Sequence, residues 1–264
     1  MWMLLVDNCV LINRKDDNMQ TFYLTDTGKV REHNEDSGII LTNENGEYLL
    51  AVADGMGGHK AGEVASAIAI NHLTEEFYAL DTLGDKDNAI EWLRSIVTEM
   101  NNKIFEYTKE NPDSKGMGTT FVCAIRTKDY LLYGNIGDSS GFVIKNHKIT
   151  KVTKDHTLVN LLVSTGELTP EEAKYHPRKN VLMRALGANN PIDIDIFDVE
   201  HGTDGILLCS DGLTNMLTES QIEKVLKEEE SAEAAVNKLI NKANARGGND
   251  NITVAYLKKE SGDM

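Results

Sequence analysis

The stretch Tyr48-Leu-Leu-Ala-Val-Ala-Asp-Gly-Met-Gly-Gly58 combines a strand-like apolar run with an acid and a glycine-rich loop. A second apolar run, Ile39-Ile-Leu-Thr42, precedes it, and Asn45-Gly46 lies between the two. Asn-Gly between runs of this composition is a strong signal for a tight β-hairpin turn. We therefore expect a β-hairpin whose second strand ends at Asp54, with a glycine loop directly after it.

The remaining elements follow from the spacing of apolar residues on both sides of this hairpin. Helical spacing after the glycine loop predicts two consecutive long helices. Strand-like runs separated by short turns then predict an antiparallel meander, and later strands alternate with two further helices. The expected helices cover 61–80, 88–110, about 219–228 and 231–245; the meander strands cover 119–126, 130–136, 141–145 and 148–152; the later strands cover 193–199, 205–209 and 252–257.

Runs of strands with helix pairs between them indicate the α+β class, with sheets that pack on each other and are covered by helices. The chain has 264 residues, a length that large sheet-based folds use for one core. We expect a single domain over 19–258, with an N-terminal extension over 1–18 and a short tail over 259–264. Residues 157–187 carry no strand signal and are expected to form an insertion over the sheet.

Charge and cysteine content restrict the partners and the compartment. The chain has 42 acidic and 27 basic residues, a net charge of -15, which disfavours nucleic acid and anionic membranes as partners. The apolar start Met1 to Val6 is interrupted by Asp7 and is too short to cross a bilayer, so no membrane insertion is expected. The odd number of cysteines, 3, fits a reducing compartment, and we expect a cytoplasmic protein.

Four aspartates lie at the ends of predicted strands: Asp54, Asp138, Asp211 and Asp250. Asp-Gly pairs also form simple turns, and for any one of these residues that interpretation is equally good. The segment Arg31-Glu-His-Asn-Glu-Asp36 adds two acids and a cation that could hold a phosphoryl group. Hard oxygen ligands without clustered His or Cys suit Mg²⁺ or Mn²⁺ and disfavour zinc.

In combination, these motifs resemble the PPM, or protein phosphatase 2C-like, metal-dependent serine/threonine phosphatases in their compact bacterial form. The resemblance covers about residues 20 to 258, with the motifs in the order that the family has. The motifs are Arg31-x-x-Asn34-Glu35-Asp36, Asp54-Gly-Met-Gly-Gly58, Gly116-Met-Gly-Thr-Thr120, Gly137-Asp-Ser139, Ser210-Asp-Gly212 and Asn249-Asp-Asn-Ile252.

The resemblance implies a four-layer αββα sandwich, in which two central antiparallel β-sheets are flanked by helix pairs. It also implies two Mn²⁺ or Mg²⁺ ions in a cleft at one end of the sheets, and a flap over about 164–180 beside that cleft. By this likeness Asp54 bridges both cations, and Asp211 and Asp250 complete the first metal site.

The same likeness assigns the remaining site residues. The Gly55 carbonyl and Glu35, directly or through water, serve the second metal, and Asp36 orients metal-bound water. Asp138 matches a third, weaker metal site that it shares with Asp211. Arg31 matches the arginine that binds the substrate phosphate.

The activity that the resemblance implies is hydrolysis of phosphoserine and phosphothreonine by direct attack of a water that a metal pair activates. The expected partners are phosphorylated proteins and a serine/threonine kinase of the same cell, and we expect a monomer. Two alternatives remain open: a catalytically weak regulatory module that binds phosphoproteins, and a phosphatase for small phosphate esters.

Two positions depart from the family pattern. Ser140 stands where the family usually has an arginine, so we expect local packing or an ion pair to differ there. Met56 stands where several relatives have a histidine that is a candidate general acid. His59, His156 and His176 are the nearest substitutes by motif position, but a histidine satisfied by hydrogen bonds is the better interpretation of each.

Overall fold

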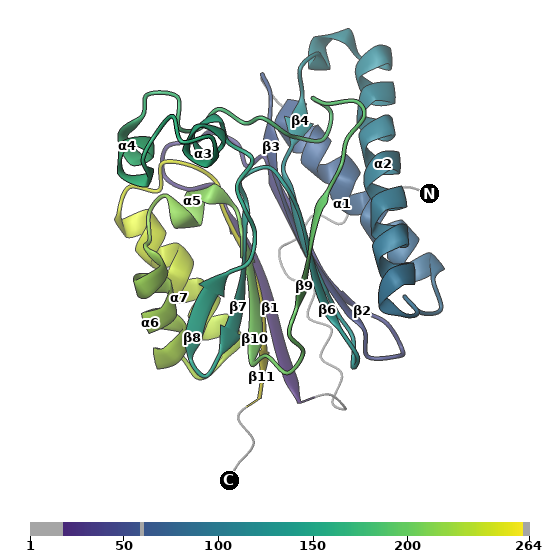
Figure 1. Ribbon diagram of the computed structural model, residues 1–264, viewed down its shortest axis with the longest axis vertical. Coiled ribbons are helices and arrows are strands. Elements are labelled where there is room, and N and C mark those ends of the chain that lie inside the picture. The colour runs from purple at the N-terminus through teal and green to yellow at the C-terminus, as the bar shows by residue number, and fades with distance from the viewer. Residues whose placement is uncertain (1–17, 59–60, 261–264) are drawn as a thin grey trace.

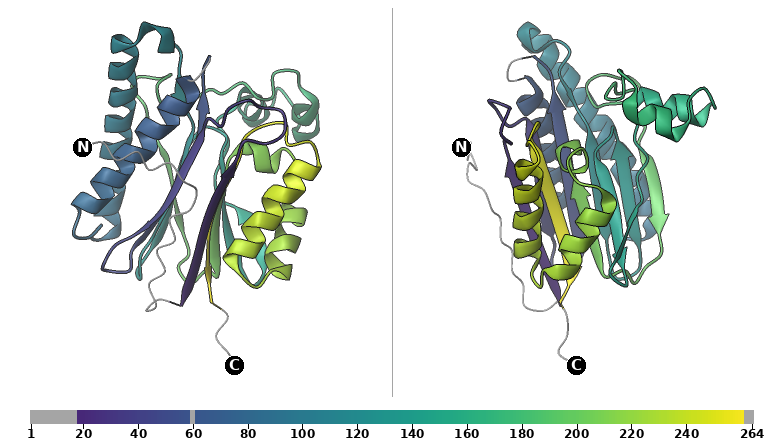
Figure 2. Two further views of the ribbon diagram at one scale, coloured as in Figure 1. Left: turned by 180° about the vertical axis from the view of Figure 1, so that it is seen from behind. Right: turned by 90° about the vertical axis from the view of Figure 1, so that its left-hand side faces the viewer.

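The computed structural model describes residues 18–58 and 61–260. Two antiparallel sheets pack face to face, and helices cover the outer face of each (Figure 1; Figure 2). The first sheet has the order β1-β11-β10-β7-β8, and the second has the order β2-β3-β5-β6-β9 with the short β4 paired to β3. The predicted four-layer sandwich of the α+β class is confirmed.

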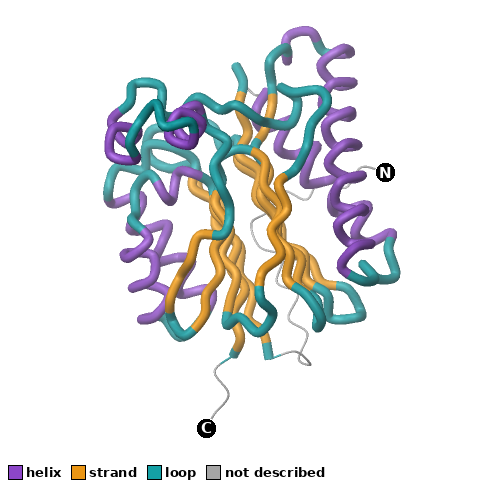
Figure 3. Tube along the Cα trace, in the orientation of Figure 1, coloured by secondary structure: helices purple, strands orange, loops and turns teal. Residues whose placement is uncertain are grey.

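The elements of the described chain follow one another as strand runs with helix pairs between them (Figure 3). The strands are β1 (Met19–Asp26), β2 (Asp36–Thr42), β3 (Tyr48–Met56), β4 (Gly118–Thr119), β5 (Phe121–Arg126), β6 (Leu131–Ile136), β7 (Ser140–Lys145), β8 (Lys148–Lys151), β9 (Asp195–Val199), β10 (Gly205–Cys209) and β11 (Ile252–Lys259). The helices are α1 (Ala61–Ala79), α2 (Lys86–Glu110), α3 (Leu158–Ser164), α4 (Pro170–Tyr175), α5 (Asp211–Thr214), α6 (Glu219–Glu228) and α7 (Ala232–Ala245), with a 3₁₀ turn at Pro112–Ser114.

Alternation along the strands divides the core into three apolar layers. In β3, Leu50 and Val52 face the other sheet, whereas Leu49 and Ala51 face α1 and α2. This follows from the two-residue period of a strand, which sends neighbouring side chains to opposite faces. A third layer lies between the first sheet and helices α6 and α7. A strand that is apolar on both faces, as β3 is, therefore lies inside the molecule.

Most of the elements expected from the sequence are present, but the predicted meander is wrong. β5 pairs with β6, and β7 pairs with β8, yet β6 and β7 belong to different sheets. The chain crosses between the sheets at Gly137, whose φ of 103° is in the region that favours glycine. β7 then pairs with β10 instead of β6. The short helix α5 was also not expected from the sequence.

The segment predicted as an insertion carries α3 and α4 and lies beside one end of the sandwich (Figure 1). An isolated bridge between Thr119 and Leu186 attaches it to β4, and a second bridge, between Thr157 and Leu182, joins two parts of the segment itself. Residues 1–17 of the predicted extension and 261–264 of the predicted tail lie outside the described residues, so the domain bounds stay a prediction. No helix in the described part of the chain is long and apolar enough to span a membrane.

Candidate active site

A cleft of about 390 Å³ opens at one end of the sandwich, beside the segment that carries α3 and α4. Seven of the eight residues predicted for the site line it, and the eighth, Asp36, is buried opposite Asp54 in the β2–β3 ladder. The lining residues are Arg31, Glu35, Asp54, Gly55, Met56, Gly57, Thr120, Asp138, Asn180, Leu182, Asp211, Asp250 and Asn251.

The topology explains why residues so distant in the sequence meet here. Asp54 lies near the end of β3, and Asp36 opens β2 directly opposite it in the antiparallel ladder. Asp211 follows β10, and Asp250 precedes β11, which pairs with β10 in antiparallel fashion. Asp138 stands where the chain leaves β6 for the other sheet. Antiparallel neighbours bring the end of one strand beside the start of the next, so both sheets deliver acids to the same rim.

Backbone hydrogen bonds fix Asp54 and leave its side chain for the cleft. Its N–H donates to Thr120 Oγ1 at 3.0 Å, and its carbonyl accepts from Thr119 Oγ1 at 2.9 Å. Thr120 Oγ1 also lies 2.8 Å from Ser139 Oγ. Burial, followed by the neighbouring carboxylates, raises the pKa of Asp54 well above its ordinary value. The two threonines of the Gly-Thr-Thr motif therefore fix the backbone of Asp54.

Asp36 is held by hydroxyls and retains one free oxygen. Its Oδ2 accepts from Ser210 Oγ and from Thr253 Oγ1, each at 2.7 Å. Its Oδ1 is buried and has no hydrogen-bond partner. Burial raises the pKa of Asp36 to about 7, although the two hydroxyls act in the opposite direction. One carboxylate oxygen is thus fixed while the other is left without a donor.

Glu35, like Asp36, has a buried carboxylate oxygen without a hydrogen-bond partner. Its N–H donates to Asn251 Oδ1 at 2.8 Å, and its buried Oε1 has no hydrogen-bond partner. The side chain packs tightly against the start of α1, because a Cβ added to Gly62 would lie 2.8 Å from Glu35 Cδ. Burial raises the pKa of Glu35, and Arg31 acts against that shift. Gly62 thus provides the space in which this carboxylate approaches the cleft.

The cleft holds more negative charge than its own basic residues can balance. Burial raises the pKa of Asp138 to about 7, and it also raises that of Asp211, whose next-largest cause is the charge of Asp250. Arg31 is the one basic residue among those lining the cleft, and its Nη2 lies 2.8 Å from Asp250 Oδ2. Buried carboxylates that lack a paired cation are costly, so this set suits bound cations.

The donor set fits divalent metal ions of the Mg²⁺ and Mn²⁺ type. All of the candidate ligands are oxygens, and the buried oxygens Glu35 Oε1 and Asp36 Oδ1 lack other partners. The carboxylates are not drawn tightly together, however. Among the described residues, three ligand atoms come within 4.8 Å of one another at His72, Glu76 and Glu99, a group outside the cleft. No three cleft carboxylates reach that spacing.

The histidines near the cleft are satisfied by hydrogen bonds, as interpreted from the sequence. His156 Nδ1 accepts from the N–H of Gly137 at 3.1 Å, and its Nε2 lies 3.2 Å from Asp195 Oδ2. His176 Nδ1 accepts from the N–H of Arg178. His59 lies outside the described residues. Met56 lines the cleft and offers no acid, so no side chain of the described chain is assigned as the proton donor.

Ser140 is fully buried at the start of β7, and its Oγ has no hydrogen-bond partner. Asp138 keeps its place on the cleft wall two residues before it. An uncharged, buried serine thus occupies the position where the family usually has an arginine, and no ion pair forms through this side chain.

Three residues that support the site were not predicted from the sequence in that role. Asn251 Nδ2 donates to the carbonyls of Thr27 and His33, each at 2.9 Å, which attaches the loop that carries Arg31 to the rim. Ser210 and Thr253 hold Asp36. All three lie in or beside the motifs Ser210-Asp-Gly212 and Asn249-Asp-Asn-Ile252, so the motifs themselves were the available signal.

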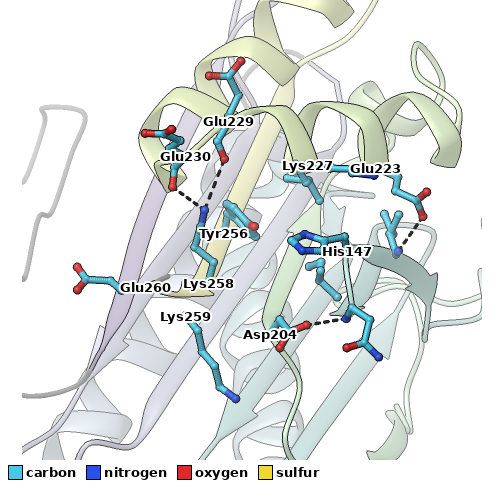
Figure 4. Close-up of a pocket in the computed structure, with 14 residues that line it drawn as sticks. His147, Asp204, Glu223, Lys227, Glu229, Glu230, Tyr256, Lys258, Lys259 and Glu260 are labelled. Carbon is cyan, nitrogen blue, oxygen red and sulfur yellow. Dashed lines mark hydrogen bonds between the residues drawn. The ribbon is translucent and has the colours of Figure 1, made fainter. Parts of the chain in front are cut away.

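A second hollow, of about 500 Å³, lies away from the cleft, between the β7–β8 turn, α6 and β11 (Figure 4). Three of its charged side chains bond to backbone: Lys258 Nζ donates to the Glu230 carbonyl at 2.6 Å, Asp204 Oδ2 accepts from the Asn146 N–H at 2.6 Å, and Glu223 Oε2 accepts from the Ile149 N–H at 3.0 Å. No predicted site residue lines it. This hollow therefore has the character of a satisfied surface, in contrast to the cleft.

Comparison with known proteins agrees with this geometry. The family model described as protein phosphatase 2C matches residues 28–253, which is most of the chain. The chain belongs to the protein phosphatase 2C family. The predicted family and the predicted enzyme class, a metal-dependent serine/threonine phosphatase and thus a hydrolase, are confirmed.

Members of the protein phosphatase 2C family from several bacteria are similar over nearly the whole chain. The serine/threonine phosphatase stp of Listeria monocytogenes is 42% identical over 243 residues, which is 92% of this chain and 96% of that protein. Protein phosphatase PhpP of Streptococcus pneumoniae is 37% identical over 248 residues, 93% of this chain and 99% of that one. The crystal structure of Staphylococcus aureus Stp1 superposes with a TM-score of 0.85 at 36% identity, covering 95% of this chain and 100% of that one.

Proposed function

We propose that the cleft removes phosphate from phosphoserine and phosphothreonine in proteins by direct attack of water on phosphorus. The observation that carries the proposal is the group of partly or fully buried carboxylates in and next to the cleft, which Arg31 alone can balance among the lining residues. Two of them, Glu35 and Asp36, keep a buried oxygen with no hydrogen-bond partner. Such a set is costly in a folded protein unless it serves a bound cation. The family membership supports the same activity.

The ligands in this proposal are oxygens of the cleft. Two Mn²⁺ or Mg²⁺ ions would share Asp54; Asp211 and Asp250 would hold one of them, and the Gly55 carbonyl and Glu35, directly or through water, would hold the other. Asp138, with Asp211, offers a third, weaker site. Bound there, divalent cations lower the pKa of water toward neutrality and stabilise charge on a phosphoryl group.

The protein's own side chains then position water and substrate. Asp36 presents its free Oδ1 from a side chain that Ser210 and Thr253 hold in place, so it can accept a hydrogen bond from the attacking water. Arg31 reaches over the rim with half of its side chain exposed, and its guanidinium can bind two phosphate oxygens at once. Because no side chain is assigned as the acid, the leaving serine or threonine oxygen takes its proton from solvent.

The partners in this proposal are phosphorylated proteins and a serine/threonine kinase whose products they are. We further propose a monomer in the cytoplasm. Free, fully buried thiols at Cys123 and Cys209 support a reducing compartment.

Phosphate release from a phosphothreonine peptide and from p-nitrophenyl phosphate tests the proposal. Each substrate is assayed with Mn²⁺, with EDTA, and with the variant Asp211→Ala. We expect turnover of the peptide with Mn²⁺ and loss of turnover under both other conditions. Turnover that survives EDTA and the substitution contradicts it. Peptide binding without turnover indicates the regulatory module, and activity restricted to p-nitrophenyl phosphate indicates a small-ester phosphatase.

A further inference from the structure

A histidine and two glutamates form a compact group between α1 and α2, outside the catalytic cleft. His72 and Glu76 lie one turn apart on α1, and Glu99 faces them from α2. His72 Nε2 lies 3.2 Å from Glu99 Oε2, and His72 Nδ1 lies 3.9 Å from Glu76 Oε1. One ligand atom from each of the three residues falls within 4.8 Å of the other two.

One of the two ring nitrogens of His72 has no hydrogen-bond partner, whereas Nε2 is hydrogen-bonded to Glu99. The His72 side chain is 5% exposed, and its Nδ1 is buried without a hydrogen-bond partner. The 3.9 Å separation from Glu76 is too long for a hydrogen bond. An unpaired buried nitrogen costs free energy that a bound group can recover. This nitrogen faces a carboxylate and has the chemistry of a metal ligand.

We propose that His72, Glu76 and Glu99 bind a divalent cation of the zinc type. Imidazole nitrogen favours Zn²⁺ over Mg²⁺, and three protein ligands leave one coordination position for water. Ser95 Oγ donates to Glu99 Oε1 at 3.0 Å, which orients that carboxylate in the manner of outer-shell partners in metal sites. Glu76 and Glu99 are 39% and 46% exposed, so the ion can enter from solvent.

This site differs from the catalytic cleft in place and in donor chemistry. His72 lies ten residues along α1 from Gly62, which contacts the cleft, and that separation corresponds to about 15 Å along a helix. The cleft offers oxygens, whereas the helix site adds a nitrogen. A cation here joins α1 to α2, the two helices that cover the outer face of the second sheet. We infer a structural role, independent of the proposed reaction.

Zinc binding to the full chain tests the proposal, with saturating Mg²⁺ present to occupy the cleft. Wild type, His72→Gln, Glu99→Gln and the matched control Glu75→Gln, which removes an exposed charge from the same helix, are titrated with Zn²⁺ by calorimetry. We expect one site in wild type and in the control, and at least tenfold weaker binding in the other two variants. Equal binding by all four proteins overturns the proposal.

Two further measurements locate the ion and guard against misfolding. An Asp211→Asn protein should keep this zinc site, because Asp211 belongs to the cleft; loss of the site there overturns the proposal. Crystals grown with Zn²⁺ should give an anomalous peak beside His72, and a peak confined to the cleft also overturns it. Glu99 is on the surface, so Glu99→Gln reports on the site even if the buried His72→Gln protein fails to fold.

Discussion

The buried carboxylates at the two ends of the β2–β3 hairpin differ in how completely their oxygens are hydrogen-bonded. At the turn end, Glu47 is 7% exposed and both of its oxygens accept hydrogen bonds: Oε1 from Thr82 Oγ1, and Oε2 from the Leu83 N–H and from Asn43 Nδ2. At the open end, Asp36 is 8% exposed and keeps one oxygen without a partner.

This difference is the one expected between a carboxylate that stabilises the fold and one that serves the proposed metal centre. Three hydrogen bonds from protein donors replace the hydrogen bonds that water would make to Glu47, so its burial adds to the stability of the turn. Asp36 and Asp54 stand directly opposite each other, with raised pKa values and too few donors. Under the proposed function, bound cations would offset the cost of these carboxylates at the open end.

The largest expected effect is at the open end, in Asp54→Asn. We expect turnover of a phosphothreonine peptide to fall by on the order of 10²-fold or more, because a principal cation ligand and its charge are lost. We also expect the metal-free variant to melt at a higher temperature than wild type, since one buried charge is removed. Asp81→Asn, an exposed change near the other end of the hairpin, is the control and should alter neither value.

Arg31→Ala removes the single basic side chain that lines the cleft. We expect kcat/KM to fall by roughly 10- to 100-fold, the range for loss of charge-assisted hydrogen bonds to phosphate. The unfolding free energy should change by less than about 1 kcal/mol, because the ion pair with Asp250 is half exposed. Steady-state kinetics and urea unfolding measure the two effects, and a large loss of stability would assign Arg31 a structural role instead.

At the turn end, replacing a carboxylate by its amide should alter stability and leave turnover unchanged. Glu47→Gln places amide hydrogens where donors already point, and we expect a loss of about 1–3 kcal/mol in unfolding free energy. Turnover by the folded variant should equal that of wild type, because Glu47 lies at the opposite end of β3 from Asp54. An unchanged urea midpoint would show that the three hydrogen bonds contribute no net stability.

The last expected effect is a dependence of stability on pH that bound metal suppresses. Asp36 and Asp138 have pKa values of about 7 in the folded protein against an ordinary value of 3.8, so the folded state binds more protons between those limits. Stability of the EDTA-treated protein should therefore receive a contribution that decreases as pH rises from about 4 to 7. Melting temperatures at pH 5 and pH 7.5 should show a smaller decrease in Asp138→Asn than in wild type, and saturating Mn²⁺ should suppress the difference. Identical pH profiles for both proteins would contradict this assignment.

The sequence predicted the parts of this molecule that depend on local chemistry. The Asn45-Gly46 turn, the strand before Asp54 and the helix after the glycine loop could all be read from neighbouring residues. The passage from β6 to β7 could not, because a short glycine turn looks the same whether the next strand joins the same sheet or the other one. Only the pairing of β7 with β10 distinguishes these cases.

The site was predictable as a set of acids, but its supports were not. Asp36 depends on Ser210 and Thr253, residues more than 170 positions away, and hydroxyls of this kind carry no periodic signal. The His72 group was missed for a related reason. His72 and Glu76 look like an ordinary exposed helix pair until α2 brings Glu99 against them.

Calorimetric titration of the EDTA-stripped full chain with Mn²⁺, for wild type and Asp54→Asn at pH 7.5, tests the central claim most directly. We expect at least two bound ions in the wild-type cleft, and loss of one or more of them in the variant. Equal stoichiometry and affinity in the two proteins would contradict the claim that the unpaired acids at the open end of the hairpin form the metal centre.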